Sequence, residues 1–268
     1  MLRRPAHFSR AGAFLGAFLA AACSGEAIPS PKYPLSSCER VALTDKATGA
    51  AITGVEDFAI DAVRERLILS AYDRAAAAKA AASGAFEIPE GGVYAVAIAD
   101  LAASNGEAAA EPLLAAGAVH GGLRPHGLVY IPQTDEIAFV NRGYRKTNDK
   151  WLLEPSIEKI SARDGAHAEG SAAAHCAAND IITDGAGLLV TFDHGSCGWR
   201  RPLEDAFALR RSGVEDEKGA SVFDRASYAN GLLELDDASI AVAATRERAI
   251  LVLEGAGGLK EARRIALP

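Results

Sequence analysis

The chain repeats one arrangement of polar and apolar positions four times. Each copy has a polar residue or pair, a short apolar strand, a turn that contains aspartate, and a second apolar strand. The copies are GVEDFAIDAVRERLILSAYD (54–73), RPHGLVYIPQTDEIAFVNRG (124–143), CAANDIITDGAGLLVTFDHG (176–195) and SYANGLLELDDASIAVAATR (227–246). Apolar runs of this length, joined by turn-forming residues, are typical of β-hairpins.

The copy at 176–195 indicates how the polar residues come together. Antiparallel strands keep a constant register, and a turn at Asp184 predicts that Asn179 pairs with His194. Asp180 and Asp193 then lie at the same end of the hairpin. Four polar side chains therefore converge at one edge of an otherwise apolar hairpin.

The spacing of the copies predicts an all-β fold. They start at Glu56, His126, Asn179 and Asn230, so the later starts are about 50 residues apart. A period of this size with several short strands in each unit is typical of a β-propeller. At about 50 residues per blade, we expect about five blades after residue 23. The first strand of each propeller blade lines the central channel, so the polar residues are predicted to point into one shared mouth.

The N-terminus has the features of a targeting segment. Arginines precede a short apolar stretch, small residues and Cys23 in MLRRPAHFSRAGAFLGAFLAAACSGEA. The apolar stretch is too short for an ordinary membrane span and has the form of an export signal. We expect a signal at 1–23, a linker at 24–37 and the propeller at 38–268.

The end of this segment, Ala20-Ala21-Ala22-Cys23, resembles a bacterial lipoprotein box. It predicts lipidation of Cys23 and a location in the periplasm at the outer membrane, or on the cell surface. The alternatives are cleavage to a soluble secreted protein and an uncleaved anchor.

Three cysteines remain after Cys23, an odd number for an exported chain. The register that pairs Asn179 with His194 also places Cys176 opposite Cys197, which predicts a disulfide across the hairpin. The alternative is two unpaired small core residues. Cys38 is left without a partner.

Charge and composition exclude some functions. The chain of 268 residues has a formal net charge of −7 and no basic patch, so nucleic acid is not an expected partner. Much of its apolar content is alanine. The alanine-rich runs at 75–82, 107–118 and 166–178 are interpreted as loops or outer strands.

The motifs GVEDFAIDA, RPHGLVYI followed by FVN, ANDIITD followed by FDHG, and YANGLLE resemble the serum paraoxonase/arylesterase family. The resemblance runs in order from about Cys38 to Leu267. It implies a six-bladed propeller with two calcium ions in the central tunnel. Gluconolactonases, regucalcin and strictosidine synthases share this architecture and are the alternatives.

The resemblance also implies roles for individual residues. Those matching the side chains that hold the catalytic calcium are Glu56, Asn179 and Asn230. Those matching the ligands of the structural calcium are Asp57, Asp180 and the carbonyl of Leu128. His126 matches the proposed general base, and Asp193 and His194 are candidates for a supporting or substrate-binding role.

These residue types suit calcium-dependent hydrolysis. Calcium takes six to eight oxygen ligands from carboxylates, amide carbonyls and water. An ion held with little ligand charge can polarise a carbonyl and stabilise the oxyanion that forms. A histidine beside it can activate the attacking water. The expected reaction is therefore hydrolysis of a lactone or an aryl ester.

The sequence departs from the family at two places. The family has a second histidine after the VN motif, and here that residue is Arg142. Arg142 is predicted to lie beside His126, where it lowers the pKa of the histidine and could bind an anionic substrate. The chain also stops at RRIALP, before the aspartate–asparagine pair that completes the family's catalytic calcium site.

We interpret this ending as a truncated reading of a longer gene, with a decayed or rearranged relative as the alternative. The unpaired Cys38 fits this interpretation, because the family pairs its early cysteine with one near the C-terminus. Two further functions remain open. One is a calcium-binding propeller without activity, and the other is an enzyme like the sugar lactonases or strictosidine synthases. The sequence identifies neither the substrate nor the oligomeric state.

Overall fold

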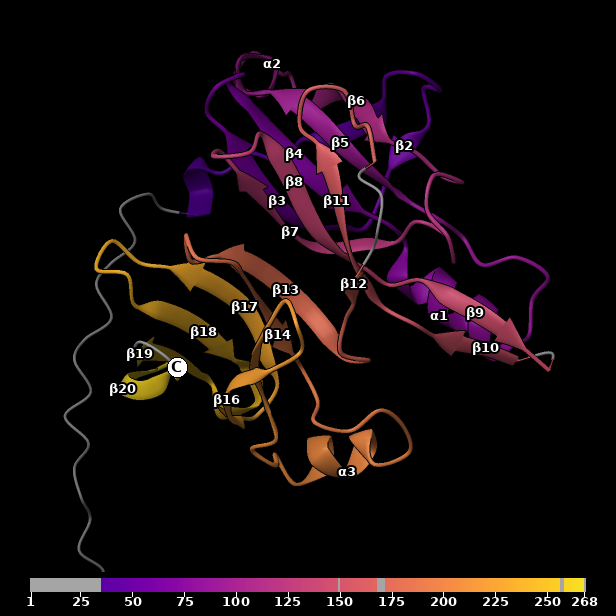
Figure 1. Ribbon diagram of the computed structural model, residues 1–268. Coiled ribbons are helices and arrows are strands. Elements are labelled where there is room, and N and C mark those ends of the chain that lie inside the picture. Colours follow the sequence, from indigo (N-terminus) through magenta and orange to yellow (C-terminus); the bar gives the residue numbers. More distant parts are fainter. Residues whose placement is uncertain (1–34, 149, 168–171, 256–257, 268) are drawn as a thin grey trace, which may run out of the picture. The chain divides into compact units, whose positions relative to one another are not determined.

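The computed structural model describes residues 35–148, 150–167, 172–255 and 258–267 (Figure 1). Residues from Leu35 onward belong to one structural unit. The predicted signal at 1–23, Cys23 and most of the linker at 24–37 lie outside the described residues. None of the helices in the described ranges is long and apolar enough to cross a membrane.

The described strands form four sheets of blade size and one separate hairpin. The first sheet contains β3 (Val55–Asp61), β4 (Arg66–Ala71), β5 (Gly92–Ala97) and β6 (Glu107–Leu114), with β1 (Ala42–Asp45) and β2 (Ala51–Ile52) added beyond β6. The second contains β7 (Pro125–Ile131), β8 (Glu136–Asn141), β11 (Ser156–Ser161) and β12 (Ala172–Ala173). The third contains β13 (Ala178–Thr183), β14 (Leu188–Phe192), β15 (Ser212–Asp216) and β16 (Ser221–Ala226). The fourth contains β17 (Ala229–Glu234), β18 (Ile240–Ala244), β19 (Ala249–Glu254) and β20 (Lys260–Ala266).

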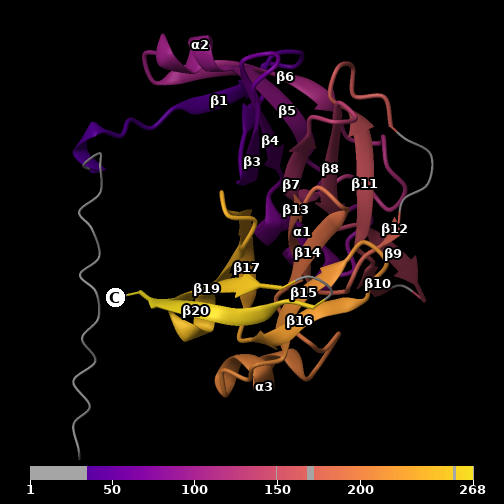
Figure 2. The same cartoon turned by 60° about the vertical axis from the view of Figure 1, so that its left-hand side comes forward.

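The four sheets follow one another in the way that propeller blades do. Within each sheet, successive strands pair antiparallel and β1 alone adds in parallel, to β6. The first strands of neighbouring sheets contact one another in the order β3, β7, β13, β17 (Figure 2). This arrangement confirms the predicted all-β, propeller-like fold.

The described chain builds four blades where its length suggested about five. The difference arises because four segments lie outside the four-stranded pattern. They are β1 with β2, helices α1 (Arg74–Ala82) and α2 (Ile98–Ala102), and the hairpin of β9 (Tyr144–Thr147) and β10 (Lys150–Leu153). The remaining short elements are helix α3 (Arg201–Ala206) and the 3₁₀ turns Leu35–Ser37 and Thr245–Glu247.

Helix α1 corrects the interpretation of the alanine run at 75–82 as a loop or an outer strand. Alanine has the highest helix propensity, and the carboxylate of Asp73 caps the helix by accepting a hydrogen bond from the Ala76 N–H at 2.8 Å. The buried Ala77 packs with Tyr72 and Ile88. The first part of the run at 107–118 forms a strand, β6, which lies inside the sheet because β1 pairs with its other edge.

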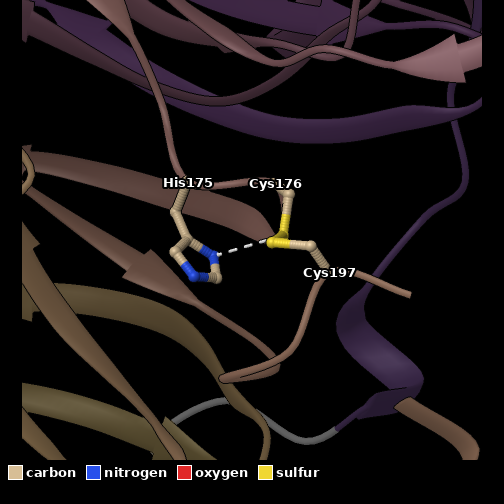
Figure 3. Close-up of side chains that lie close together, drawn as sticks. All are labelled: His175, Cys176 and Cys197. Carbon is tan, nitrogen blue, oxygen red and sulfur yellow. Dashed lines mark hydrogen bonds between the residues drawn. A yellow bond between two sulfur atoms is a disulfide. The ribbon is translucent and has the colours of Figure 1, made fainter. Parts of the chain in front are cut away.

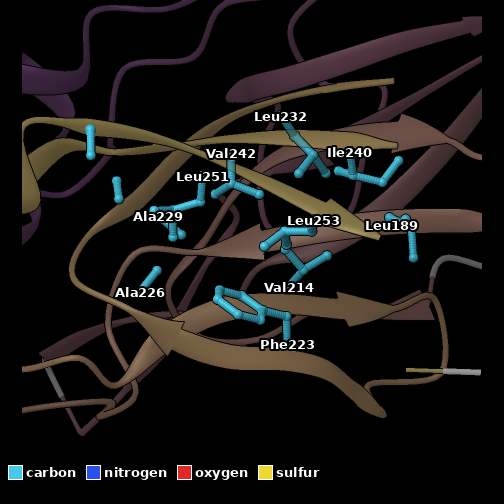
Figure 4. Packing of buried hydrophobic residues seen from close by; sticks show 12 residues of the cluster. Leu189, Val214, Phe223, Ala226, Ala229, Leu232, Ile240, Val242, Leu251 and Leu253 are labelled. Atoms are coloured by element: carbon cyan, nitrogen blue, oxygen red, sulfur yellow. The ribbon is translucent and has the colours of Figure 1, made fainter. Parts of the chain in front are cut away.

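The hydrophobic core lies between adjacent sheets. Figure 4 shows the largest cluster, in which Val214 and Phe223 of the third sheet pack against Leu232, Leu251 and Leu253 of the fourth. Each blade therefore buries apolar surface against its neighbour, and the order of the blades determines which residues meet.

The hairpin of β13 and β14 corrects the predicted register by two residues. Ile181 pairs with Val190, whereas the predicted register pairs it with Phe192. Asp184 causes the difference, because its Oδ1 accepts hydrogen bonds from the N–H groups of Ala186 and Gly187, both at 2.9 Å, and so draws the turn one residue earlier. A shift of two residues keeps the side chains of Ile181–Thr183 on their predicted faces, and the bulge between Ala178 and Ile181 adds one further residue to the shift.

All four first strands carry a β-bulge at equivalent places. The irregularities fall between Val55 and Asp57 in β3, Pro125 and Leu128 in β7, Ala178 and Ile181 in β13, and Ala229 and Leu232 in β17. A bulge interrupts the ladder and frees backbone groups for other partners. The polar residues singled out in the sequence lie inside these bulges.

The freed backbone groups join neighbouring blades. Asp57 Oδ2 in β3 accepts a hydrogen bond from the Leu128 N–H in β7 at 2.8 Å, and the Ser70 hydroxyl donates to the carbonyl of His126.

The same arrangement recurs between the third and fourth blades. There Asp180 Oδ2 accepts from the Leu232 N–H at 2.7 Å, and the Thr191 hydroxyl donates to the carbonyl of Asn230 at 2.7 Å. An aspartate together with a hydroxyl therefore joins the first blade to the second and the third to the fourth.

Glycine occupies the equivalent place in the second blade. A Cβ atom at Gly127 would lie 2.4 Å from the Cα of Asp180 and 2.7 Å from the carbonyl oxygen of Asn179. We expect Gly127→Ala to destabilise the protein by about 3 kcal/mol or more, because overpacking at a backbone contact cannot be relieved by a side-chain rotation. The denaturant midpoint measures this change.

Gly187→Ala is the matched control for that variant. Gly187 has open space around its Cβ position and lies in the turn between β13 and β14, the hairpin that Gly127 approaches. An equal loss of stability in both variants would show that the contact between β7 and β13 is not the cause.

A charged network joins the first two blades away from the bulges. Arg64 donates to Asp61 Oδ2 at 2.9 Å and to Asp135 Oδ1 at 2.8 Å, and Arg66 Nε donates to Asp61 Oδ2 at 2.9 Å. Burial alone would raise the pKa of Asp61, but the hydrogen bonds from Arg64 and Arg66 outweigh it and lower this pKa. The hydrogen bonds from Arg64 also lower the pKa of Asp135.

This network predicts a pH dependence of stability. A carboxyl group whose pKa is lower in the folded state contributes stability above its unfolded pKa, near 4, and loses that contribution as the pH falls through the folded value. We expect Arg64→Met to be less stable than the wild type at pH 7 and to differ from it much less at pH 3. Urea midpoints at both values test this, with the exposed Arg225→Met as the control. A difference that stays constant with pH would contradict the assignment.

Candidate functional site

The predicted site residues lie at one end of the blades. Glu56, His126, Asn179 and Asn230 occupy the bulges near the starts of β3, β7, β13 and β17. Arg142 and Asp193 directly follow the ends of β8 and β14, which are the antiparallel partners of β7 and β13. The bulges and the strand ends therefore present their side chains on the same side of the blades.

Asp57 and Asp180 face each other between the first and third blades. Their side chains are close enough that each affects the pKa of the other, and among the described residues neither forms an ion pair. Burial, and then the neighbouring carboxylate of Asp57, raises the pKa of Asp180, and burial raises that of Asp57. Two facing carboxylates repel unless they share a proton or a cation.

Leu128 lies beside these carboxylates, since its N–H donates to Asp57. The structure thus brings together the three residues that the sequence assigned to one calcium ion. Their arrangement differs from a chance cluster of surface acids, because backbone N–H groups of the neighbouring blades fix one oxygen of each carboxylate.

His126 is almost fully enclosed, with 4% of its surface exposed. Its Nδ1 lies 3.4 Å from Glu56 Oε2, but the angle is unsuitable for a hydrogen bond, and neither ring nitrogen has a partner. Burial, followed by the charges of Arg142 and Arg74, lowers the pKa of His126 to about 3. The imidazole is therefore neutral at physiological pH. The charge of Arg142 contributes to the lowered pKa, as the sequence predicted.

Two residues near His126 were not identified from the sequence. The ring of Tyr72 lies edge-on to His126, with centroids 6.2 Å apart, and its buried hydroxyl has no hydrogen-bond partner. Arg74 lies 3.7 Å from Glu56 Oε1. Tyr72 directly follows β4 as Arg142 directly follows β8, and that equivalence is the signal that could have revealed it, whereas Arg74 is the first residue of α1.

His194 lies between two carboxylates in the third blade. Its Nδ1 is 2.6 Å from Asp193 Oδ1, and its Nε2 is 3.3 Å from Asp205 Oδ1. The Asn179 side-chain amide donates to Asp193 Oδ2 at 3.4 Å. Tyr228 packs edge-on against His194, with ring centroids 5.2 Å apart. Asn179 thus belongs to the group around Asp193 and His194.

The three residues assigned to the catalytic calcium are less closely associated. Glu56 contacts His126 and Arg74, Asn179 contacts Asp193, and the carbonyl of Asn230 accepts from Thr191. Within the described ranges no hydrogen bond joins these three residues to one another.

The predicted disulfide between Cys176 and Cys197 is confirmed, with Cα atoms 5.6 Å apart (Figure 3). It joins the chain just before Asn179 to the chain just after His194. His175 lies against it, and these three side chains could by position hold a metal ion. Both sulfur atoms are bonded to each other, however, which leaves only the imidazole as a ligand. Cys38 is exposed and forms no disulfide with a described cysteine.

No protein-family model matches the chain, and neither does any curated protein sequence. Its fold is similar to that of a protein of unknown function from Bacteroides caccae, with a TM-score of 0.48 and 11% identity over 79% of this chain and 60% of that one. It is also similar to the periplasmic gluconolactonase PpgL of Pseudomonas aeruginosa, with a TM-score of 0.47 and 11% identity over 84% of this chain and 63% of that one. The chain spans less than two thirds of either protein. Similarities at this level carry no argument about activity.

Proposed function

We propose that this chain is an exported, calcium-binding propeller that hydrolyses lactones or carboxylic esters. The observation that carries the proposal is the pair of facing carboxylates, Asp57 and Asp180, which have no cationic partner among the described residues. The paraoxonase resemblance suggests the same two residues independently. The disulfide supports export, because such bonds persist in oxidising compartments.

The donor set fits calcium better than a transition metal. Carboxylate and carbonyl oxygens are the ligands that calcium prefers, whereas sulfur and imidazole favour zinc or copper. Asp57 and Asp180 would hold a structural ion together with the Leu128 carbonyl, and this ion would neutralise their repulsion. A second ion would bind Glu56, Asn179 and Asn230, with water as the remaining ligands, and would polarise the carbonyl of a bound ester or lactone.

His126 is the residue we propose as the base. It is neutral, its two ring nitrogens have no partner, and it adjoins Glu56. A neutral imidazole can accept the proton of a water molecule as that water attacks a carbonyl carbon. The products would be a hydroxy acid from a lactone, or an acid and a phenol from an aryl ester.

A second candidate function is a calcium-binding propeller without activity. Arg142 favours it, because its charge near His126 makes the imidazole a weaker base than in an enzyme with a histidine at that place. Lipid anchoring at Cys23, the soluble secreted form, and a sugar-lactonase-like or strictosidine-synthase-like activity are further proposals that the sequence alone suggests.

Calcium is expected to stabilise the protein through Asp57 and Asp180. A ligand present at one hundred times its dissociation constant adds about 2.7 kcal/mol to the free energy of unfolding. In a protein of this size, this raises Tm by about 5–10 °C. We expect that increase on adding calcium to chelator-treated protein, and its loss in Asp57→Asn, measured by thermal denaturation.

Asp236→Asn is the control for this experiment, because Asp236 is exposed in the turn between β17 and β18. Asp57→Asn should also be more stable than the wild type in chelator, since it removes one of two repelling charges. Equal stabilisation of wild type and Asp57→Asn by calcium would contradict the proposed structural ion.

Turnover is expected to depend on His126. We expect His126→Gln to lower kcat for phenyl acetate and for a γ-lactone by about 10²–10⁴-fold, the usual contribution of a general base. The calcium-dependent increase in Tm should stay unchanged. His120→Gln, at an exposed histidine, is the control. Near-wild-type turnover in His126→Gln would exclude His126 as the base and make His194 the next residue to test. Absence of turnover in the wild type, with calcium still bound, would support the second candidate, a calcium-binding propeller that has no enzymatic activity.

A further inference from the structure

Two adjacent side chains at the site carry buried polar atoms that have no hydrogen-bond partner. The Tyr72 hydroxyl and both ring nitrogens of His126 are buried without a hydrogen-bond partner. Buried polar groups in folded proteins almost always have a partner, so such atoms mark a place where a water molecule or a polar ligand can bind. Two unpartnered side chains of adjacent blades lie next to each other here, with 6.2 Å between their ring centroids.

Arg142 supplies positive charge to the same place. Its backbone N–H donates to the carbonyl of Arg124, two residues before His126, at 2.9 Å. Burial raises the pKa of Tyr72 and lowers that of His126, and the charge of Arg142 is the second cause acting on each. Arg142 is half-buried, and its Nη1 donates to the carbonyl of Ala178 at 3.1 Å. Among the described residues it forms no ion pair, unlike Arg74, whose charge lies 3.7 Å from Glu56.

An arginine in this state can bind an anion. A guanidinium stays protonated and offers five N–H donors, and it pairs with carboxylates through two parallel hydrogen bonds. Only one donation by the Arg142 side chain is used within the described chain. The Tyr72 hydroxyl is a second free donor beside the same imidazole.

We propose that Arg142 and the Tyr72 hydroxyl bind a carboxylate of the substrate, so that the substrates are lactones or esters that carry a carboxylate beside the reacting carbonyl. The assignment of a reacting carbonyl rests on the proposed hydrolysis, whereas the binding of a carboxylate does not. Arg142 is then the residue that determines specificity and has no role in proton transfer.

A purely structural role for Arg142 makes a different prediction. Its hydrogen bond to Ala178 joins the end of β8 to β13, and loss of that bond would affect all substrates alike. The discriminating measurement is therefore selectivity between two substrates that differ only in charge. A suitable pair is 5-oxotetrahydrofuran-2-carboxylate and its uncharged carboxamide.

The test compares wild type, Arg142→Gln and Arg145→Gln in the presence of calcium. Arg145 is an exposed arginine of β9 that pairs with Glu154, and its variant is the control. We expect Arg142→Gln to lower kcat/KM for the carboxylate lactone by about 100-fold, chiefly through KM, and to change that for the carboxamide by less than about threefold. An equal loss on both lactones would overturn the proposal.

Calorimetry with glutarate tests binding without turnover. We expect wild type and Arg145→Gln to bind glutarate equally, and Arg142→Gln and Tyr72→Phe to bind it at least tenfold more weakly. Equal binding by wild type and Arg142→Gln would overturn the carboxylate site whatever the kinetics show. If the wild type hydrolyses neither lactone but shows this loss of glutarate binding, the anion site stands and the proposed hydrolysis fails.

Discussion

The structure depends on the hydrogen bonds that two aspartates make across blade boundaries. Asp57 and Asp180 each accept an N–H from the first strand of the next blade. These bonds hold the first strands together at the bulges, where ladder hydrogen bonds are interrupted. They also bring two carboxylates face to face. Stabilising the blade boundaries therefore places two carboxylates close together, and the calcium ion that we propose would offset their repulsion.

The repeat and its polar positions could be predicted from the sequence because they follow from local rules. Alternating apolar strands and aspartate turns determine hairpins, and the hairpins bring their polar ends together. The pairing of Cys176 with Cys197 followed from the same geometry, although the assumed register was two residues away from the observed one. A shift of two residues preserves faces in the regular part of the hairpin, and the polar residues still lie together at its end because they occupy the bulge.

The remaining features depend on contacts between blades, which no local pattern reveals. Nothing in the segment around Tyr72 shows that its hydroxyl lacks a partner, since this depends on β7 of the next blade. Arg74 was missed because the run of alanines after it was interpreted as a loop or a strand and forms a helix. The close approach of Gly127 to Asp180 likewise requires the positions of both blades.

The alternation of the bulge residues divides the protein into pairs of blades. The first and third blades carry aspartate with a hydroxyl on the partner strand, Ser70 or Thr191. The second and fourth carry glycine at the aspartate position, Gly127 or Gly231. The repeating unit is thus a pair of blades. One blade contributes the aspartate and the hydroxyl, and the next contributes the backbone N–H and the carbonyl to which they bond. Within such a pair the blades are joined through an aspartate and a hydroxyl, whereas at the boundary between β7 and β13 they are joined through the close approach of Gly127 to Asp180 and the hydrogen bond from Arg142 to the carbonyl of Ala178.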